Sequence, residues 1–225
     1  MIMKVKILLI FFIVLGSNAL LAQSFTLNEQ DIIVLKERAK EKVAMMNKYV
    51  SFMADPQKNS KTRYGYKEEA QNLFINNCNP FTEIIEFEDG AKETIQRESV
   101  TMQVASLRNK RPRTKPMKEY FRGLINMNYK YVQMESTDIA DMRVSKLQPY
   151  GVDSNGNKLY ICSVYFDQIF VGITPEGRKY QDITHKWVVC YVQVDEVFDE
   201  NTGGTYQEYM VRLGDVHVES IEKLW

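Results

Sequence analysis

Residues 158–198, KLYICSVYFDQIFVGITPEGRKYQDITHKWVVCYVQVDEVF, decide the fold that this sequence predicts. Apolar and polar side chains alternate over 158–172 and again over 180–198, which is the period of two typical of strands with a buried face. A Pro-Glu-Gly turn at 175–177 separates the two runs, and both proline and glycine are favoured in turns. The stretch therefore predicts a long antiparallel hairpin centred on Glu176.

A hairpin centred on Glu176 pairs positions that are equally far from it, so Cys162 lies opposite Cys190. Directly opposite residues have Cβ atoms about 4.5–5.5 Å apart, whereas a disulfide prefers about 3.8 Å. The register thus allows a somewhat strained disulfide between Cys162 and Cys190 in an oxidising compartment. The alternative is two buried free thiols that act as small core residues. The third cysteine, Cys78, would stay free in either case.

The second strand of this hairpin carries polar side chains on both faces. Tyr180 and Asp182 begin a face that becomes apolar further along the strand, which predicts a strand that passes from a rim into a core. His185 and Trp187 lie on the other face. Histidine suits proton transfer near neutral pH, but a catalytic His185 would need a carboxylate partner and an open pocket. The alternative is a partly exposed histidine without a catalytic role.

Aromatic side chains are plentiful on the two strands, and they define the candidate ligand site. Aromatic residues are enriched in strands, where they pack across the sheet. They also line concave sheet faces that bind small ligands. The residues we predict for a ligand site are Tyr160, Phe166, Tyr180, Asp182, His185 and Trp187.

Further elements precede and follow the hairpin. Thr26 and Glu29 fit a capping box at the start of a long amphipathic helix, and Asp55-Pro56 ends it. We predict helices over 27–54, 64–77 and 117–126, strands over 82–88, 92–107, 129–147 (broken near Ala140) and 205–219, and a basic loop over 108–118.

The basic segment 108–118, RNKRPRTKPMK, contains two prolines. A charge run of this size predicts a solvated connecting loop. The alternative is a contact with anionic lipid head groups or with an acidic partner.

The first residues predict a cleaved secretory signal peptide over 1–23. Lys4 and Lys6 precede an apolar run, and small residues near Ala22 suit signal peptidase. The run is too short for a bilayer span of about 20 residues. We therefore expect a single α+β domain over 24–225 in the periplasm or outside the cell, not an integral membrane protein.

Charge and motifs narrow the classes of function. The whole chain has 29 Lys+Arg and 29 Asp+Glu, and loss of Lys4 and Lys6 leaves a net charge of 27 − 29 = −2. Nucleic-acid-binding proteins are usually basic, so we expect no nucleic-acid partner. The two histidines and three cysteines show no metal-ligand spacing. The sequence thus predicts neither a metal nor a cofactor.

The order of the predicted elements is helix, helix, hairpin, short helix and a meander of long strands. This order resembles the nuclear transport factor 2-like superfamily, which has the cystatin-like fold. The stretches YQDITHKW (180–187) and VRLGDV (211–216) look like sheet strands of its small exported bacterial members. The resemblance implies an α+β fold in which N-terminal helices pack on a curved antiparallel sheet that forms a cone. The superfamily includes isomerases, dehydratases, transport factors and binding modules.

These observations predict an exported, non-enzymatic binding or envelope-assembly module. Its partner would be an envelope protein or a small ligand. The alternative is a small pocket enzyme of the isomerase or hydratase type, in which an acidic residue and a Tyr or His converge on an apolar cavity. A third hypothesis is that the protein binds a peptide or a glycan on its outer sheet face. The sequence predicts no particular oligomeric state.

Overall fold

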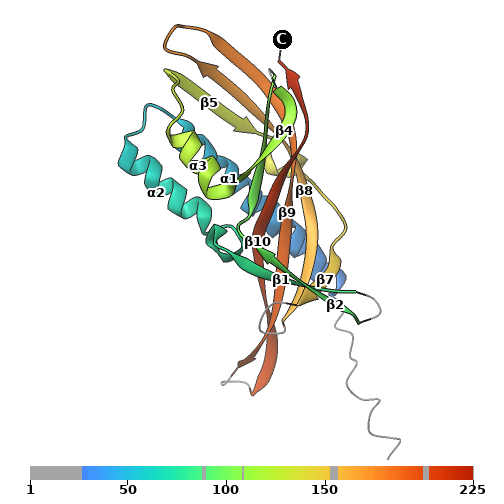
Figure 1. Cartoon of the computed structure of the whole chain (residues 1–225). Coiled ribbons are helices and arrows are strands. Elements are labelled where there is room, and N and C mark those ends of the chain that lie inside the picture. The colour runs from blue at the N-terminus through green and yellow to red at the C-terminus, as the bar shows by residue number, and fades with distance from the viewer. Residues whose placement is uncertain (1–26, 88–89, 108, 153–156, 200–202, 225) are drawn as a thin grey trace, which may run out of the picture. The chain divides into compact units, whose positions relative to one another are not determined.

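The computed structural model describes residues 27–87, 90–107, 109–152, 157–199 and 203–224 (Figure 1). The chain divides into two units, residues 1–32 and 33–225, and the fold described below is that of the second unit. The predicted signal peptide, 1–23, lies outside the described residues. Its cleavage and the single domain over 24–225 therefore stay predictions.

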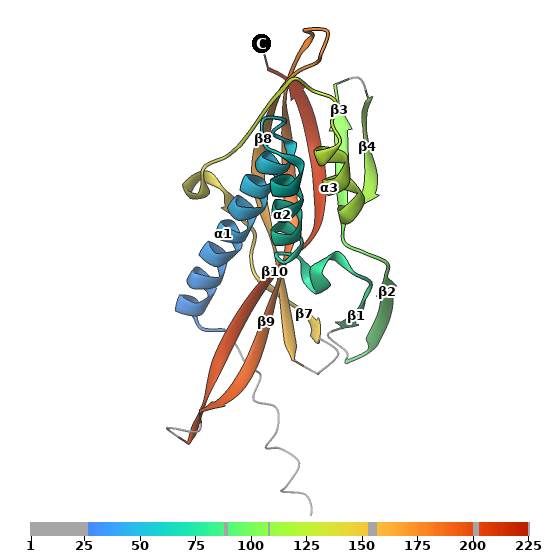
Figure 2. The same ribbon diagram turned by 90° about the vertical axis from the view of Figure 1, so that its left-hand side faces the viewer.

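Helices lie on one face of a large sheet (Figures 1 and 2). They are α1 Glu29–Ala54, α2 Ser60–Gln71 and α3 Met117–Ile125, with 3-10 turns η1 Ile75–Cys78 and η2 Ile139–Asp141. The strands are β1 Phe81–Glu86, β2 Lys92–Arg97, β3 Thr101–Ser106, β4 Asn109–Pro116, β5 Tyr131–Ser136, β6 Arg143–Val144, β7 Gln148–Val152, β8 Lys158–Ile173, β9 Lys179–Asp199 and β10 Gly204–Lys223. The predicted α+β class is confirmed.

The strands follow the order β2-β1-β7-β8-β9-β10-β3-β4, and β5 and β6 also pair with β8. The sheet is mixed, because β3 joins β10 in parallel at Met102 and Val216. The prediction of a wholly antiparallel sheet is therefore wrong at this pair. Residues 92–107, predicted as one strand, form two: β2 stays beside β1, and β3 pairs with β10 and β4.

The predicted hairpin is present with the predicted register. β8 and β9 pair over sixteen positions, and Cys162 lies opposite Cys190. Even-numbered residues of β8 and β9 share one face, which we call the inner face because Gln168 bonds to Asn47 of α1 there. The other face is the outer face. Inner-face side chains in the middle of the hairpin are buried, so the strand passes from a rim at Tyr180 into the core.

The basic segment is a strand and not the predicted loop. Residues 109–116 form β4, which pairs with β3 and lies at an edge of the sheet that the described strands form. An edge strand tolerates Pro112, because one side of its backbone needs no partner strand. Exposed Arg111 and Arg113 suit the same place, since charged side chains on an edge oppose pairing with another chain.

Other helices and strands begin or end at residues that differ from the prediction, and each difference has a local reason. The amide of Asp31 donates to Asn28 Oδ1, so Asn28 caps α1, and Thr26 lies outside the described residues. Asn59 caps α2 in the same way, which moves the helix to Ser60–Gln71 from the predicted 64–77. The predicted strand 129–147 is broken into β5, η2 and β6, and β7 was not predicted.

Gly214 permits a close contact that any side chain would obstruct. A Cβ atom at this position would lie 2.4 Å from the ring of Tyr191. We expect Gly214→Ala to lower the free energy of unfolding by about 1–3 kcal/mol, the usual effect of overpacking. Urea denaturation followed by circular dichroism measures this change.

The matched control is Gly123→Ala on α3, where an added Cβ would have no atom within 4 Å. Alanine favours a helix over glycine by up to about 1 kcal/mol, so this variant should be at least as stable as the wild type. Equal stability of Gly214→Ala and the wild type would show that Tyr191 moves aside at no cost.

Candidate functional site

A pocket of about 390 Å³ lies between α3 and the inner face, and we call it the α3 pocket. The residues that matter most in its lining are Tyr129, Gln168, Phe170, Tyr180, Asp182 and Lys186. β3 and α3 complete the wall with apolar side chains such as Val104 and Leu124. The pocket thus has the mostly apolar lining with a few polar groups that small-ligand sites have.

Three aromatic rings cluster at one end of the α3 pocket. The ring centroid of Tyr129 lies 5.5 Å from that of Phe170 and 6.4 Å from that of Tyr180, both in edge-to-face contact. Gly172 makes room for this cluster, because a Cβ there would lie 2.7 Å from the Tyr129 ring. Since the Tyr180 side chain is partly exposed, the cluster forms a rim that an apolar ligand could contact.

Lys186 supplies a buried cation to the wall of the α3 pocket. The residue is 7% exposed, and its Nζ donates to Gln168 Oε1 at 2.6 Å. An ammonium group has three N–H donors, and this is the one hydrogen bond that it makes among the described residues. Burial lowers the pKa of Lys186 to about 8, and the negative charge of Asp182 partly opposes that shift.

Asp182 shares the inner face with Lys186, and Thr184 lies between them on β9. Burial raises the pKa of Asp182 to about 6, and the Lys186 charge opposes this shift. Within the described residues the two charged groups form no ion pair with each other. The pocket therefore contains an acid and a base whose pKa values have both moved toward neutrality.

The structure divides the predicted ligand residues between the two faces. Tyr180 and Asp182 line the α3 pocket, whereas His185 and Trp187 lie on the outer face. Tyr160 and Phe166 are buried on the inner face and do not line the α3 pocket, but Phe166 and His185 both line another, smaller pocket.

His185 has both features that the sequence argument required of a catalytic histidine. Its Nδ1 lies 2.6 Å from Asp167 Oδ1, and its Nε2 lies 3.8 Å from Glu222 Oε1. A polar pocket of about 190 Å³ is lined by His185 and Arg143 together with two inner-face residues, Phe166 and Lys186. The hydroxyl of Thr137 also lines it, but that oxygen accepts from the Asp167 amide at 2.8 Å. The arrangement orients an imidazole but offers it few apolar contacts for a substrate.

A buried polar cluster elsewhere has a structural role. The Tyr191 hydroxyl donates to Glu83 Oε1 at 2.5 Å, and Arg97 forms ion pairs with both Glu83 and Asp215. Asp215 also accepts from the Thr101 amide at 2.6 Å. These contacts join β1, β2 and β3 to β9 and β10, and every polar group named is satisfied inside the protein.

Sequence reasoning found Asp182 but missed two other polar residues of the α3 pocket, Lys186 and Gln168. The available signal was a charged residue on a strand face that is apolar at Val188 and Cys190. The sequence does not place Tyr129 in the site, because its contact with Phe170 joins residues far apart in the chain.

The described residues contain no group of three or more His, Cys, Asp or Glu side chains that could hold a metal ion. Likewise, none of the helices described is long and apolar enough to cross a membrane. The chain matches no family model, no curated protein and no solved structure.

Cys162 and Cys190 are free thiols in the structure, as is Cys78, and all three are buried. The register that brings Cys162 opposite Cys190 is confirmed, whereas their disulfide stays a prediction. A hydrogen bond with Cys190 lowers the pKa of Cys162, and that bond together with burial raises the pKa of Cys190.

We expect protein exported to an oxidising compartment to release one reactive thiol on unfolding, Cys78, because Cys162 and Cys190 would be bridged. Thiol titration in guanidinium without reductant measures the number of reactive thiols in the unfolded protein. Cys162→Ser should raise it to two, since Cys190 then loses its partner. Three reactive thiols in the exported wild-type protein would contradict the disulfide.

Proposed function

We propose that the chain is an exported, non-enzymatic binding module that holds a small, largely apolar ligand with one anionic group in the α3 pocket. The observation that carries this proposal is the Lys186 ammonium. It is buried in the pocket wall and makes a single hydrogen bond among the described residues. A ligand anion would use the remaining donors in a poorly hydrated place, where hydrogen bonds to charged groups are strong.

We further propose that the chain is a divergent member of the nuclear transport factor 2-like superfamily with a cystatin-like cone. Helices on one face of a large, mainly antiparallel sheet, with a pocket between them, support this assignment. The export signal predicted over 1–23 supports a place in the cell envelope.

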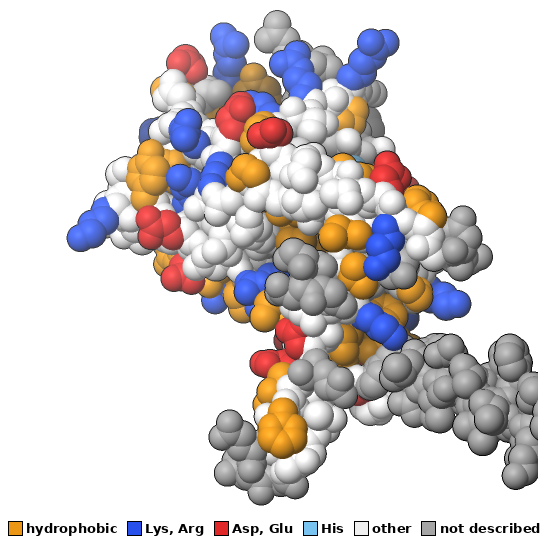
Figure 3. All heavy atoms as spheres, turned by 60° about the horizontal axis from the view of Figure 1, so that its bottom comes forward, with side chains coloured by type: hydrophobic (Ala, Val, Ile, Leu, Met, Phe, Trp, Pro, Cys, Tyr) orange, Lys and Arg blue, Asp and Glu red, His pale blue; other side chains and the backbone are white. Residues whose placement is uncertain are grey.

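An envelope partner would find an apolar surface at the far end of β9 and β10. Among the described residues, β9 pairs beyond Val194 with β10 and with no other strand. Phe198 and Tyr206 on this end are 61% and 53% exposed, and Figure 3 shows apolar side chains on it in orange. Phe198 lies opposite Thr205 and Tyr206 lies opposite Val197, so the two rings are on opposite faces of the ribbon. Each face thus offers an exposed apolar side chain to a partner, which supports the assembly role.

The two shifted pKa values set the pH dependence of ligand binding. An anion binds best when Lys186 is charged and Asp182 is neutral, which is the state below about pH 6. Between about pH 6 and 8 the ionised Asp182 opposes the ligand. Above about pH 8 Lys186 also loses its charge, so affinity should be lowest there.

Titration with 8-anilinonaphthalene-1-sulfonate, an apolar fluorophore with one sulfonate, tests this proposal. We expect saturable fluorescence whose affinity falls as the pH rises from 5 to 9. Lys186→Met should weaken binding about tenfold, since a lost charged hydrogen bond costs about 1.5 kcal/mol or more. Asp182→Asn should remove the fall in affinity near pH 6 and should move the fall that Lys186 causes to a lower pH, because Lys186 loses the carboxylate that raises its pKa.

Lys179→Met is the matched control, because Lys179 is an exposed lysine on the same strand. It should bind the fluorophore like the wild type. Equal weakening in both lysine variants, or affinity that does not depend on pH, would contradict binding at Lys186. Melting temperatures of all variants separate loss of the site from loss of the fold.

A second candidate function is a small pocket enzyme of the isomerase or hydratase type. Asp182, with its pKa raised to about 6 beside an apolar wall, favours this candidate, because a general base works best with a pKa near the ambient pH. Such an enzyme would exchange protons next to a carbonyl group with solvent. NMR of enolisable ketones in D₂O detects that exchange.

We expect Asp182→Asn to reduce any such exchange by about 10²–10⁴-fold, the usual contribution of a general base. His185→Gln is the control on the opposite face. Exchange that is unchanged in Asp182→Asn would exclude the α3 pocket as its source.

A further inference from the structure

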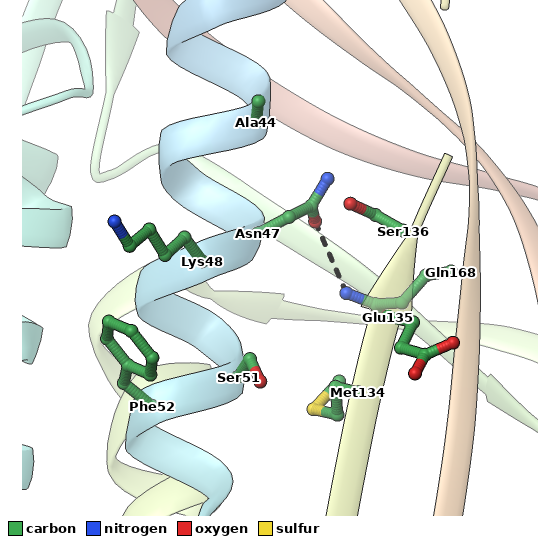
Figure 4. Close-up of a pocket in the computed structure, with 9 residues that line it drawn as sticks. All are labelled: Ala44, Asn47, Lys48, Ser51, Phe52, Met134, Glu135, Ser136 and Gln168. Carbon is green, nitrogen blue, oxygen red and sulfur yellow. Dashed lines mark hydrogen bonds between the residues drawn. The ribbon is translucent and has the colours of Figure 1, made fainter. Parts of the chain in front are cut away.

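A second, smaller pocket lies between α1 and β5, and we call it the α1 pocket. Its volume is about 200 Å³. The side chains that matter in its lining are Asn47 and Ser51 from α1, Met134 and Ser136 from β5, and Gln168 from β8 (Figure 4). Met134 and Gln168 also line the α3 pocket, so these two side chains separate the two pockets.

Asn47 brings an unsatisfied donor to the α1 pocket. The residue is 6% exposed, and its Oδ1 accepts from Gln168 Nε2 at 3.3 Å. Its Nδ2 has no hydrogen-bond partner, and it is the one buried side-chain nitrogen or oxygen in that state among the described residues. Leaving such a group unpaired in the interior is costly, so a buried donor of this kind calls for an acceptor from outside the chain.

Lys186 fixes the direction in which Asn47 points. An ammonium can only donate, so Gln168 must turn its Oε1 toward Lys186 Nζ, at 2.6 Å. The Gln168 amide nitrogen therefore faces α1, and Asn47 must meet it with Oδ1. Reversing the Asn47 amide would bring two donors together. The Nδ2 group is thereby held toward the α1 pocket, on the side of Ser136 (Figure 4).

Two charged residues, Lys48 and Glu135, belong to the lining of the α1 pocket, but neither charge faces the amide nitrogen of Asn47. In Figure 4 the Lys48 ammonium lies on the other side of α1 from the Asn47 amide nitrogen. The Glu135 carboxylate accepts from Gln133 Nε2 at 2.6 Å, and Glu135 faces away from its neighbour Ser136 on the strand. An anion beside Asn47 would therefore lose its hydration without gaining a counter-charge, which is costly. The acceptor that fits is neutral.

We propose that the α1 pocket is a second ligand site, which binds a small molecule through a neutral carbonyl oxygen that accepts from Asn47 Nδ2. The hydroxyl groups of Ser51 and Ser136 lie in the same lining and can donate to, or accept from, the rest of the ligand. This site is distinct from the α3 pocket and does not depend on the function proposed for it.

Side-chain amide signals of ¹⁵N-labelled full-length protein test the proposal, with the Asn47 pair assigned through its loss in Asn47→Asp. Titration with N-methylacetamide, a neutral carbonyl compound, should shift the Asn47 pair with saturation. Acetate and methylammonium at equal concentration should give little or no shift. An absent or non-saturating shift with N-methylacetamide would overturn the proposal, as would a soaked crystal in which water alone occupies the site.

Two variants separate a bound carbonyl from a general effect of solvent. Asn47→Asp keeps the shape of the side chain but removes the donor, so binding of N-methylacetamide should weaken about tenfold. Asn128→Asp adds the same charge at an exposed asparagine and should change nothing. Comparable weakening in both would contradict a role for Asn47 Nδ2.

Lys186→Met tests the orientation argument, although Lys186 does not line the α1 pocket. Without the ammonium, Gln168 can present its oxygen to Asn47, which then turns its own oxygen to the pocket. N-methylacetamide should bind several-fold more weakly, while 8-anilinonaphthalene-1-sulfonate reports the α3 pocket separately. Unchanged affinity for N-methylacetamide would refute the control of Asn47 by Lys186.

Discussion

The pairing of β8 with β9 is the constraint on which both pockets depend. It places Gln168, Asp182 and Lys186 on the inner face together, under α1 and α3. A slip of one strand by one residue would turn its side chains to the outer face and separate Gln168 on β8 from Asp182 and Lys186 on β9, because strand side chains alternate. Buried cross-strand pairs such as Val164 with Val188 and Cys162 with Cys190 oppose that slip, since it would expose them. The core of the hairpin therefore sets the geometry of the polar groups near its end.

The buried ammonium of Lys186 has a cost that the surrounding structure must offset. A pKa of about 8 instead of 10.5 corresponds to roughly 3 kcal/mol against the charged form in the folded state. This destabilisation is fully present below about pH 8 and disappears as the pH rises past 10.5, where the unfolded chain also loses the proton. Gln168 supplies one acceptor in return. An apolar side chain would avoid the cost, which is why a charge kept on a pocket wall indicates a site.

Local patterns in the sequence were sufficient to predict the central hairpin. Alternation on β8 and β9 and the turn between them gave the register of Cys162 against Cys190, because each signal lies within the strands that pair. They could not predict the parallel contact of β3 with β10, since Met102 and Val216 are far apart in the chain. The strand over 109–116 was missed for a related reason: lysine, arginine and proline are tolerated there only because β4 is at an edge.

The residues of the candidate site divide in the same way, into those that a local pattern predicts and those that depend on contacts between distant parts of the chain. Tyr180 and Asp182 were predicted because they lie at the polar start of a strand face. Lys186 could not be predicted as a site residue from the sequence, because only its contacts with Gln168 and the pocket wall distinguish it from an exposed lysine.

The hydrogen bonds from Lys186 to Gln168 and from Gln168 to Asn47 form a directed chain between the two pockets. The Lys186 ammonium alone fixes its direction, because an ammonium group donates hydrogen bonds and cannot accept them. An anion in the α3 pocket would use the N–H groups of Lys186 that Gln168 leaves free and would favour the charged form of Lys186, so it would hold the amide orientations beyond it. Coupling of this kind is reciprocal: a carbonyl on Asn47 would favour the state in which Gln168 stays bonded to Lys186. Two ligands would then influence each other through three side chains, with no movement of the backbone required.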